Sequence, residues 1–286
     1  MNITAAVILT AGFGSRMLPV TAAVQKELLP ILNRPVIDYV VADCVAAGIT
    51  RIIFVIRPGS HGLQDYYNGN VDLESHLDRH HKPAELELLT KAHHQATFEF
   101  VEQPASLGYG TAVPMIAVAP HLPHDEAFVV CGGDDFLWHG DGTSEIVALM
   151  QTFRAAKAEG ALMALERPTD ELHRYGVLSV QRRGRHEYLR TIVEKPAPHQ
   201  APSNLINISK YILTPKIMEY VMKVKPDPKS GELLIVDAIQ SAAVDYPVAV
   251  HHAAGAFLDA GNVTSWLKAN LTVATDLGIY KNESLL

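Results

Sequence analysis

The run Ala5-Ala6-Val7-Ile8-Leu9 leads directly into Thr10-Ala11-Gly12-Phe13-Gly14-Ser15-Arg16, and this stretch decides the fold class. An uninterrupted apolar run is typical of a strand that is buried on both faces. Glycines in the turn that follows let the backbone approach a ligand, and consecutive amides can hold phosphate oxygens. The stretch therefore predicts a buried strand that ends in a phosphate-binding turn. A tight turn without a ligand is the alternative.

The next segments extend this strand into a sheet. Residues 36–47 place apolar side chains at helical spacing, and Gly48 is expected to end the helix. Arg51–Ile56 is a second buried strand, closed by Pro58-Gly59. A strand, a helix and a further strand in this order form a βαβ unit, which predicts parallel pairing.

The remainder of the chain continues to alternate, with a more strand-rich second half. Residues 60–95 are polar and rich in histidine, and their pattern predicts a helical excursion. Further strands are expected at 97–101, 127–131, 161–166, 176–181, 187–194 and 204–213, and helices at 111–119, 144–158, 215–223, 232–244 and 263–279. We expect one α/β domain over residues 1–286, with a mixed, mostly parallel sheet flanked by helices.

Composition excludes several classes of protein. With 48% hydrophobic and 19% charged residues among 286, the chain is not expected to be disordered. Its net charge of −7 disfavours a nucleic-acid partner. No apolar run is long enough for a membrane helix, and the start has no secretory pattern. Cys44 and Cys131 form no metal-binding or disulfide pattern, so we expect buried thiols in the cytoplasm.

Two familiar phosphate-binding motifs do not fit the glycine-rich turn. A dinucleotide-binding fingerprint requires a third glycine where the chain has Met17, which argues against an oxidoreductase, and the P-loop pattern is absent. Arg16 and Lys26 nevertheless place two cations near the turn, which suits a triphosphate. Solvated surface charges are the plainer interpretation of both side chains.

A longer pattern resembles a known family. Residues 11–19, Thr21 and Lys26-Glu27-Leu28-Leu29-Pro30 resemble the signature of the nucleotide-sugar pyrophosphorylases, which transfer a nucleotidyl group to a sugar 1-phosphate and release pyrophosphate. Other segments that agree in order are Gln103, Gly108 to Ala112, Gly133-Asp134-Asp135, Tyr175-Gly176-Val177, Val193 to Pro196, Pro202-Ser203-Asn204, Gly231-Glu232-Leu233, Asp237-Ala238-Ile239 and Asp259 to Asn262. The resemblance implies a nucleotide-diphospho-sugar transferase fold, which is Rossmann-like.

Within this family the chain is most similar to the bacterial uridylyltransferase branch, because the excursion at 60–95 contains Leu73-Glu74-Ser75-His76-Leu77. The resemblance implies Mg²⁺-dependent synthesis of UDP-glucose, in which glucose 1-phosphate attacks the α-phosphorus of UTP. The same chemistry with dTTP or another sugar 1-phosphate remains open. A regulatory relative that only binds nucleotide sugar or a partner subunit would be expected to lose the charged residues, and they are present.

The resemblance also implies a role for each charged residue. Arg16 would neutralise the leaving pyrophosphate, Lys26 would contact the α-phosphate, and Lys195 would hold the sugar phosphate. Asp134 and Asp259 would hold Mg²⁺, whose preference for hard oxygen ligands they satisfy. Paired aspartates in loops are often only turn residues, which is the simpler alternative.

Two further sets would recognise the organic parts of the substrates. Base and nucleotide recognition would come from Ala11, Gly12, Gly14, Gln103 and Gly108. Sugar recognition would come from Gly176, Glu194 and Asn204. The side-chain amide of Gln103 offers both a donor and an acceptor to the uracil edge.

This assignment divides the domain into parts. Residues 1–140 would form the nucleotide-binding half, 141–262 the sugar-phosphate half, and 263–286 a C-terminal helix that associates into a homodimer or homotetramer, the last by resemblance alone. The fourteen histidines include adjacent pairs at 80–81, 93–94 and 251–252. Because adjacent side chains point apart, we expect solvated surface histidines rather than a metal site.

Overall fold

A computed structural model of the chain describes residues 2–91 and 94–281. Within these residues the strands are β1 (Ala5–Leu9), β2 (Pro30–Ile31), β3 (Arg34–Pro35), β4 (Arg51–Ile56), β5 (Thr97–Glu102), β6 (Phe128–Gly132), β7 (Asp135–Trp138), β8 (Gly160–Glu166), β9 (Gly176–Arg183), β10 (His186–Glu194), β11 (Leu205–Leu213), β12 (Val248–His252) and β13 (Ala256–Asp259). The helices are α1 (Val36–Ala46), α2 (Gly62–Tyr67), α3 (Val71–Arg79), α4 (Pro83–Lys91), α5 (Val113–Val118), α6 (Glu145–Ala155), α7 (Pro215–Val221), α8 (Ile235–Asp245) and α9 (Val263–Asp276).

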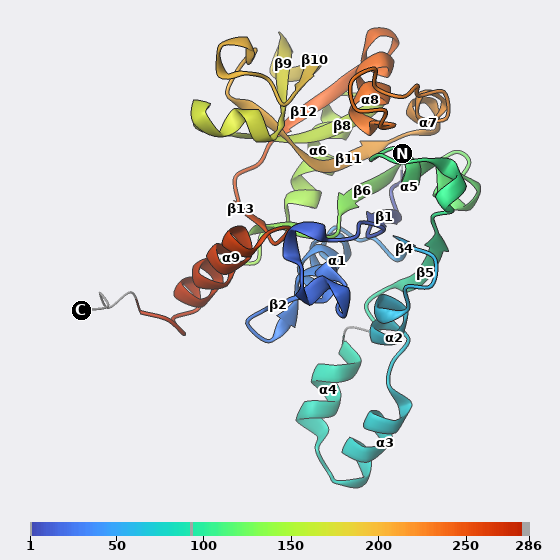
Figure 1. Ribbon diagram of the computed structural model, residues 1–286, viewed down its shortest axis with the longest axis vertical. Helices are drawn as coiled ribbons and strands as arrows, with labels where there is room; N and C mark the ends of the chain where they lie inside the picture. Colours follow the sequence, from blue (N-terminus) through green and yellow to red (C-terminus); the bar gives the residue numbers. More distant parts are fainter. Residues whose placement is uncertain (1, 92–93, 282–286) are drawn as a thin grey trace.

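A mixed sheet forms the centre of the molecule (Figure 1). In the described part of the chain its nine strands run in the order β5-β4-β1-β6-β11-β8-β12-β10-β9. The strands β5, β4, β1 and β6 pair in parallel, as the βαβ pattern predicts, and β8 pairs with β12 in the same way. Antiparallel pairs join β11 to β6 and β8, and β10 to β9 and β12. The parallel half therefore continues into a more antiparallel half.

Strand β1 is buried on both faces, which confirms the interpretation of its apolar run. Ala6 and Ile8 pack into one hydrophobic cluster, and Ala5 and Val7 pack into another. Residues of α1 and α6 belong to the first cluster, whereas residues of α5, α7 and α8 belong to the second. Helices thus cover both faces of the sheet.

Gly48 ends α1 as predicted, because the chain turns there into the left-handed region, with φ of 84°. The amide of Ile49 then donates to the carbonyl of Cys44, 3.1 Å away, which satisfies a carbonyl at the helix end. Cys44 and Cys131 are buried free thiols, also as expected. The excursion at 60–95 contains α2, α3 and α4, and α3 and α4 project from the body (Figure 1).

Several strands were not expected from the sequence. The strands β7 and β13 form an antiparallel ribbon, and β2 and β3 form another. Strand β12 lies inside the main sheet between β8 and β10. Three of these strands are four or five residues long, and their partners are distant in sequence, so their local apolar patterns are weak. Among the described residues, no helix is long and apolar enough to span a membrane.

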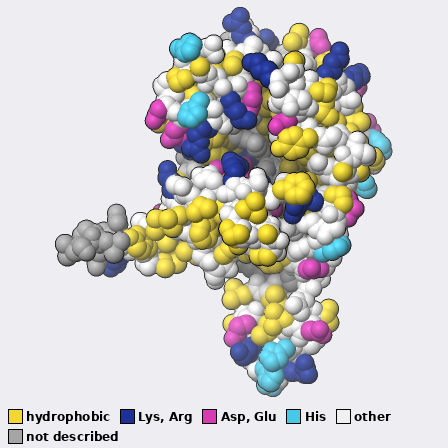
Figure 2. Space-filling view, in the orientation of Figure 1, with side chains coloured by type: hydrophobic (Ala, Val, Ile, Leu, Met, Phe, Trp, Pro, Cys, Tyr) yellow, Lys and Arg dark blue, Asp and Glu magenta, His cyan; other side chains and the backbone are white. Residues whose placement is uncertain are grey.

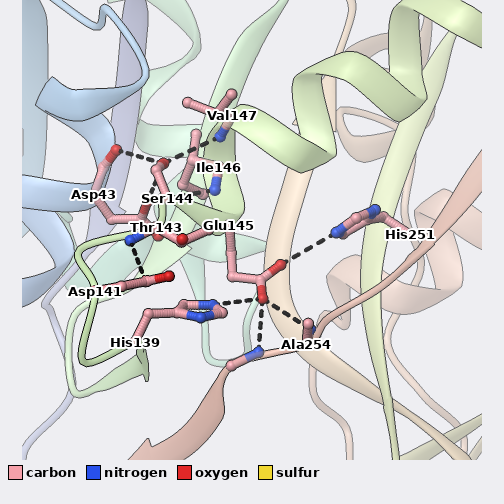
Figure 3. Close-up of polar contacts among 11 residues, drawn as sticks. Asp43, His139, Asp141, Thr143, Ser144, Glu145, Ile146, Val147, His251 and Ala254 are labelled. Atoms are coloured by element: carbon pink, nitrogen blue, oxygen red, sulfur yellow. Dashed lines mark hydrogen bonds and ion pairs between the residues drawn. The ribbon is translucent and has the colours of Figure 1, made fainter.

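Two histidines contradict the expectation that histidines are solvated. His139 and His251 place Nε2 atoms 2.8 and 3.2 Å from the Glu145 carboxylate, and their side chains are only 16% and 15% exposed (Figure 3). The same carboxylate accepts hydrogen bonds from the amides of Ala254 and Gly255. His251 and its neighbour His252 do point apart, because His252 pairs with Glu187 instead. Glu145 therefore ties α6 to the segment between β12 and β13.

Candidate active site

The side chain of Lys26 packs against the glycine-rich turn that follows β1. Gly14 lies in the left-handed region with φ of 67°, which favours glycine. The Thr21 hydroxyl donates to the Gly14 carbonyl over 2.8 Å and closes the turn. A Cβ added to Gly12 would lie 3.4 Å from Lys26 Nζ. The second cation of the motif thus folds back over the first glycine.

Lys26 forms an ion pair with the first predicted metal ligand. Its Nζ lies 2.6 Å from Asp134 Oδ2 and 3.7 Å from Glu27 Oε1. Burial alone would lower the pKa of Lys26, but the negative charges of Asp134 and Glu27 raise it above its ordinary value. Burial would raise the pKa of Asp134, but Lys26 and then Arg16 hold it below its ordinary value. Both groups therefore stay charged at neutral pH.

Glu27 is the deepest carboxylate of this group. Its side chain is 1% exposed, and neither carboxylate oxygen has a hydrogen-bond partner among the described residues. Burial raises the pKa of Glu27 to about 8, and the positive charge of Lys26 limits the rise. Glu27 was not singled out in the sequence, although it stands inside the signature.

Gly261 is the point at which three predicted site residues meet. A Cβ added there would lie 2.8 Å from Arg16 Nη2 and 3.0 Å from Asp134 Oδ2. It would also lie 2.8 Å from Asp259 Oδ1, which accepts a hydrogen bond from the Gly261 amide. Glycine is required because a side chain would displace these groups. The β7–β13 ribbon brings the two aspartates together, because Asp259 is in register with Asp135.

The two aspartates are suited to a hard divalent cation. Burial, with the negative charges of Asp134 and Asp135, raises the pKa of Asp259 above its ordinary value. A bound cation would relieve this repulsion. Mg²⁺ commonly takes one or two carboxylates and completes its shell with waters and substrate phosphates. No group of three or more histidine, cysteine or carboxylate side chains within residues 2–91 and 94–281 could hold a metal, so waters and substrate oxygens would complete the shell around the two aspartates.

Asp135, which was not among the predicted metal ligands, is paired with a buried lysine. Its carboxylate forms an ion pair with Lys210 of β11, and Lys210 also donates to the Asp135 carbonyl over 3.1 Å. Lys210 is 1% exposed. Burial would lower its pKa, but the charge of Asp135 raises it well above its ordinary value. Lys210 was missed in the sequence because it lies inside a strand, outside the segments of the signature.

Three of the predicted sugar and phosphate residues lie together at the adjoining ends of β9 and β10. Gly176 is in register with Glu194, and a Cβ added to Gly176 would lie 3.0 Å from Glu194 Oε2. Lys195 follows with φ of 45° and places Nζ 3.4 Å from Glu194 Oε1. Its amide donates to the Tyr175 carbonyl, which fixes the strand ends. Both charged side chains are accessible to a ligand.

Asn207 lies beside this group, although it was not singled out in the sequence. A Cβ added to Gly176 would be 3.9 Å from the Cβ of Asn207, and Asn207 Oδ1 is buried without a hydrogen-bond partner among the described residues. The amide of Asn207 donates to the Tyr211 hydroxyl. Asn204, the predicted residue, is exposed and gives its backbone carbonyl to the amide of Arg167. Asn207 was missed because it stands inside a strand.

Three of the five predicted nucleotide-binding residues line one cavity, whereas Gly12 and Gly14 are not among its lining residues. Ala11, Gln103 and Gly108 surround a space of about 550 Å³, together with Phe13, Arg57 and Tyr109. The cavity lies at the carboxyl ends of β1, β4 and β5, where open α/β sheets bind ligands. Larger cavities of about 960 and 730 Å³ lie beside α3–α4 and beside α9, away from the charged groups described above. Figure 2 shows the molecule hollowed between its upper part and the body.

The comparison with known proteins identifies the family. The sequence profile described as "Nucleotidyl transferase" matches residues 5–276. The chain belongs to the nucleotidyl transferase family. This agrees with the signature at residues 11–30 and confirms the fold that it implied.

Individual relatives of this nucleotidyl transferase are named for one reaction. A UTP–glucose-1-phosphate uridylyltransferase of Pseudomonas aeruginosa is 33% identical over 264 residues, which is 91% of either chain. A UTP-bound UGPase from Acinetobacter baumannii superposes with a TM-score of 0.86 at 27% identity and covers 96% of this chain and 94% of that one. A UDP-glucose pyrophosphorylase complexed with UDP-glucose gives 0.83 at 25% identity and covers 96% and 99%.

Proposed function

We propose that this nucleotidyl transferase forms UDP-glucose and pyrophosphate from UTP and glucose 1-phosphate. The observation that carries the proposal is the meeting of Arg16, Asp134 and Asp259 at Gly261. Lys26 extends that group toward the glycine-rich turn. Relatives that cover nearly the whole chain are named for this reaction, and one solved relative is described as UTP-bound.

The reaction joins two anions, so the residues of the chain act mainly by positioning and by neutralising charge. Arg16 would bind the departing pyrophosphate, and Lys26 would leave Asp134 to contact the α-phosphate. Glu27 Oε1, 3.7 Å from Lys26 Nζ, would remain as a polar neighbour of the lysine. Lys195 would hold the phosphate of glucose 1-phosphate so that its oxygen faces the α-phosphorus in line. Glu194 and the backbone at Gly176 would receive the sugar hydroxyls.

Asp134 and Asp259 would hold Mg²⁺ during this reaction. Mg²⁺ supplies charge stabilisation to the phosphate oxygens when it is bound. The raised pKa of Asp259 supports this role, because burial and the neighbouring negative charges disfavour its ionised form, which a bound cation would stabilise.

We also propose that the chain works as a homodimer or homotetramer in the cytoplasm. Exposed apolar side chains follow α9 and its C-terminal continuation, and they form a yellow band in Figure 2. They are Val263, Leu267, Leu271, Leu277, Ile279 and Tyr280. A contiguous exposed apolar surface of this kind favours association. The free thiols of Cys44 and Cys131 suit a reducing compartment.

A substrate panel tests the proposed reaction. Pyrophosphate release would be measured with UTP, dTTP, CTP, ATP and GTP, each combined with glucose 1-phosphate, galactose 1-phosphate or mannose 1-phosphate. We expect UTP with glucose 1-phosphate to give the highest kcat/KM and to require Mg²⁺. Preference for dTTP would show that the base site selects thymine rather than uracil. Tight binding of UTP without pyrophosphate release would instead indicate a regulatory protein.

A further inference from the structure

A positively charged side chain stands inside the cavity described above for the base. Arg57 follows β4 directly and lines the cavity with Ala11, Gln103 and Gly108. Among the described lining residues it is the one with a formal charge. The backbone around it is held by the Gln103 amide, which donates to the Ile56 carbonyl over 2.8 Å. Arg57 was not among the residues singled out in the sequence.

The guanidinium of Arg57 lies against an aromatic ring, and one of its nitrogens lacks a hydrogen-bond partner. Its Cζ lies 4.7 Å from the centre of the Phe13 ring, a stacking distance for a cation over an aromatic face. Its Nε is buried and has no hydrogen-bond partner among the described residues. Buried polar groups in native proteins are nearly always hydrogen-bonded, so an unpaired donor in a ligand cavity indicates a group that the ligand satisfies.

We propose that Arg57 is a specificity residue that donates a hydrogen bond to the 4-carbonyl oxygen of a pyrimidine base. A guanidinium has only donors, so it favours an acceptor at that position. Uracil and thymine carry a carbonyl there, whereas cytosine carries an amino group. The inference rests on the proposed function, because it takes the cavity as the base site.

The position of Arg57 favours the base over the phosphates. The residues that suit phosphate, Arg16 and Lys26, do not line this cavity. Lys26 folds over Gly12 toward Asp134 instead. Arg57 shares its cavity with Gln103, whose side-chain amide has the donor and acceptor needed for a base edge.

Binding measurements on Arg57→Ala test this assignment without requiring turnover. Calorimetric titration with UTP and with CTP would be made on the wild-type chain and the variant. We expect the variant to bind UTP about tenfold or more weakly, because a hydrogen bond from a charged donor is lost, and CTP within about twofold of wild type. Arg57→Lys keeps the charge but not the planar fork, so we expect an intermediate loss of UTP affinity.

A control and a contrary outcome make the test specific. Arg183 also stacks on an aromatic ring, 5.3 Å from the centre of Tyr188, but it lies at the exposed end of β9 and does not line the cavity, so Arg183→Ala should bind both nucleotides normally. Equal losses of UTP and CTP affinity in Arg57→Ala would assign Arg57 to the phosphates and overturn the inference. Unchanged UTP affinity would overturn it as well. A wild-type chain that binds neither nucleotide would contradict the proposed function itself.

Discussion

Asp134 and Asp259 meet at Gly261 because Asp134 directly precedes β7 and Asp259 ends β13, and β7 and β13 pair with each other. The amide of Ala260 also donates to the Asp134 carbonyl over 2.8 Å, which holds the backbones of the two residues together. The negative charge gathered there is balanced by Arg16 and Lys26. Neutralising one of these carboxylates by substitution should therefore lower the reaction rate more than it lowers the stability of the fold.

We expect Asp134→Asn to lower kcat at saturating Mg²⁺ by about 10²-fold or more, because charge stabilisation at the reacting phosphates is lost. Glu27 remains beside Lys26, so the unfolding transition should stay cooperative. Steady-state pyrophosphate release and circular dichroism measure the two effects. Asp141→Asn, which alters an exposed loop, is the matched control. A near-wild-type rate for Asp134→Asn would rule out the metal assignment.

Lys195 offers a test of the sugar side of the site. We expect Lys195→Ala to raise the KM for glucose 1-phosphate about tenfold or more and to leave the KM for UTP within about twofold, because a charged contact to one substrate is removed. Initial rates with each substrate varied in turn provide the measurement. Lys216→Ala is the control, since that exposed lysine pairs with Glu159 elsewhere. Parallel losses for both substrates would contradict the assignment.

The signature identified the site residues that stand in contiguous motifs. It missed the residues that only folding brings to the site. Arg16 and Lys26 both follow the glycines of one turn within a single signature, so a local pattern was enough to single them out. Arg57, Asn207 and Lys210 stand in or beside strands, where a polar residue has no local signal. Their proximity to the site depends on strand order and register, which no short window contains.

At the scale of elements, Glu145 links α6 to the segment before β13, the strand that carries Asp259. Burial would raise its pKa, but hydrogen bonds from His251, from the amides of Gly255 and Ala254, and from His139 lower it to about 2. A lowered pKa means that the folded state favours the ionised carboxylate. This stabilisation is complete above about pH 4.5 and is lost as the pH falls toward about 2.

We expect Glu145→Gln to lower the free energy of unfolding by about 1–3 kcal/mol at pH 7, because an amide group would face backbone donors. The difference from wild type should narrow as the pH falls below about 4.5. Urea unfolding at a series of pH values measures both effects. Glu171→Gln, which alters a more exposed pair with Arg167, should change little. A pH-independent difference would exclude the ionised carboxylate as the cause.

Long buried strands and amphipathic helices could be predicted because burial imposes a regular pattern on them. The predicted helix at 36–47 and strand at 51–56 match α1 and β4 closely. The strands β7 and β13 were not predicted, since short ribbons depend on a distant partner more than on their own residues. The site depends on that unpredicted ribbon.

At the scale of the whole molecule, the net charge of −7 coexists with a local group of cations. Net charge bears on long polyanions, whereas one triphosphate interacts with charges within about a Debye length. One mixed sheet contains both β1, which precedes Arg16 and Lys26, and β10, which precedes Lys195. The cations of the chain therefore come from both its parallel and its antiparallel half. The order of strands along the sheet had to be seen in the structure, because pairing between distant segments leaves no contiguous pattern.

The apolar band on α9 predicts assembly. Leu267 and Leu271 are 52% and 42% exposed and lie one turn apart. We expect Leu271→Asp, alone or with Leu267→Asp, to shift the mass measured by light scattering toward the 31.2 kDa monomer, because a buried charge would oppose association. Val244→Asp on α8, at a residue that is 83% exposed, is the control. A wild-type chain that is already monomeric would contradict the proposed oligomer.

Transfer of isotopic label tests the central claim most directly. The wild-type chain would be incubated with glucose 1-phosphate, Mg²⁺ and UTP labelled at either the α- or the γ-phosphorus, and the products would be separated. Attack on the α-phosphorus predicts that the α-label enters UDP-glucose and that the γ-label leaves in pyrophosphate. Recovery of the α-label in pyrophosphate, or bound UTP that transfers no label, would contradict the account.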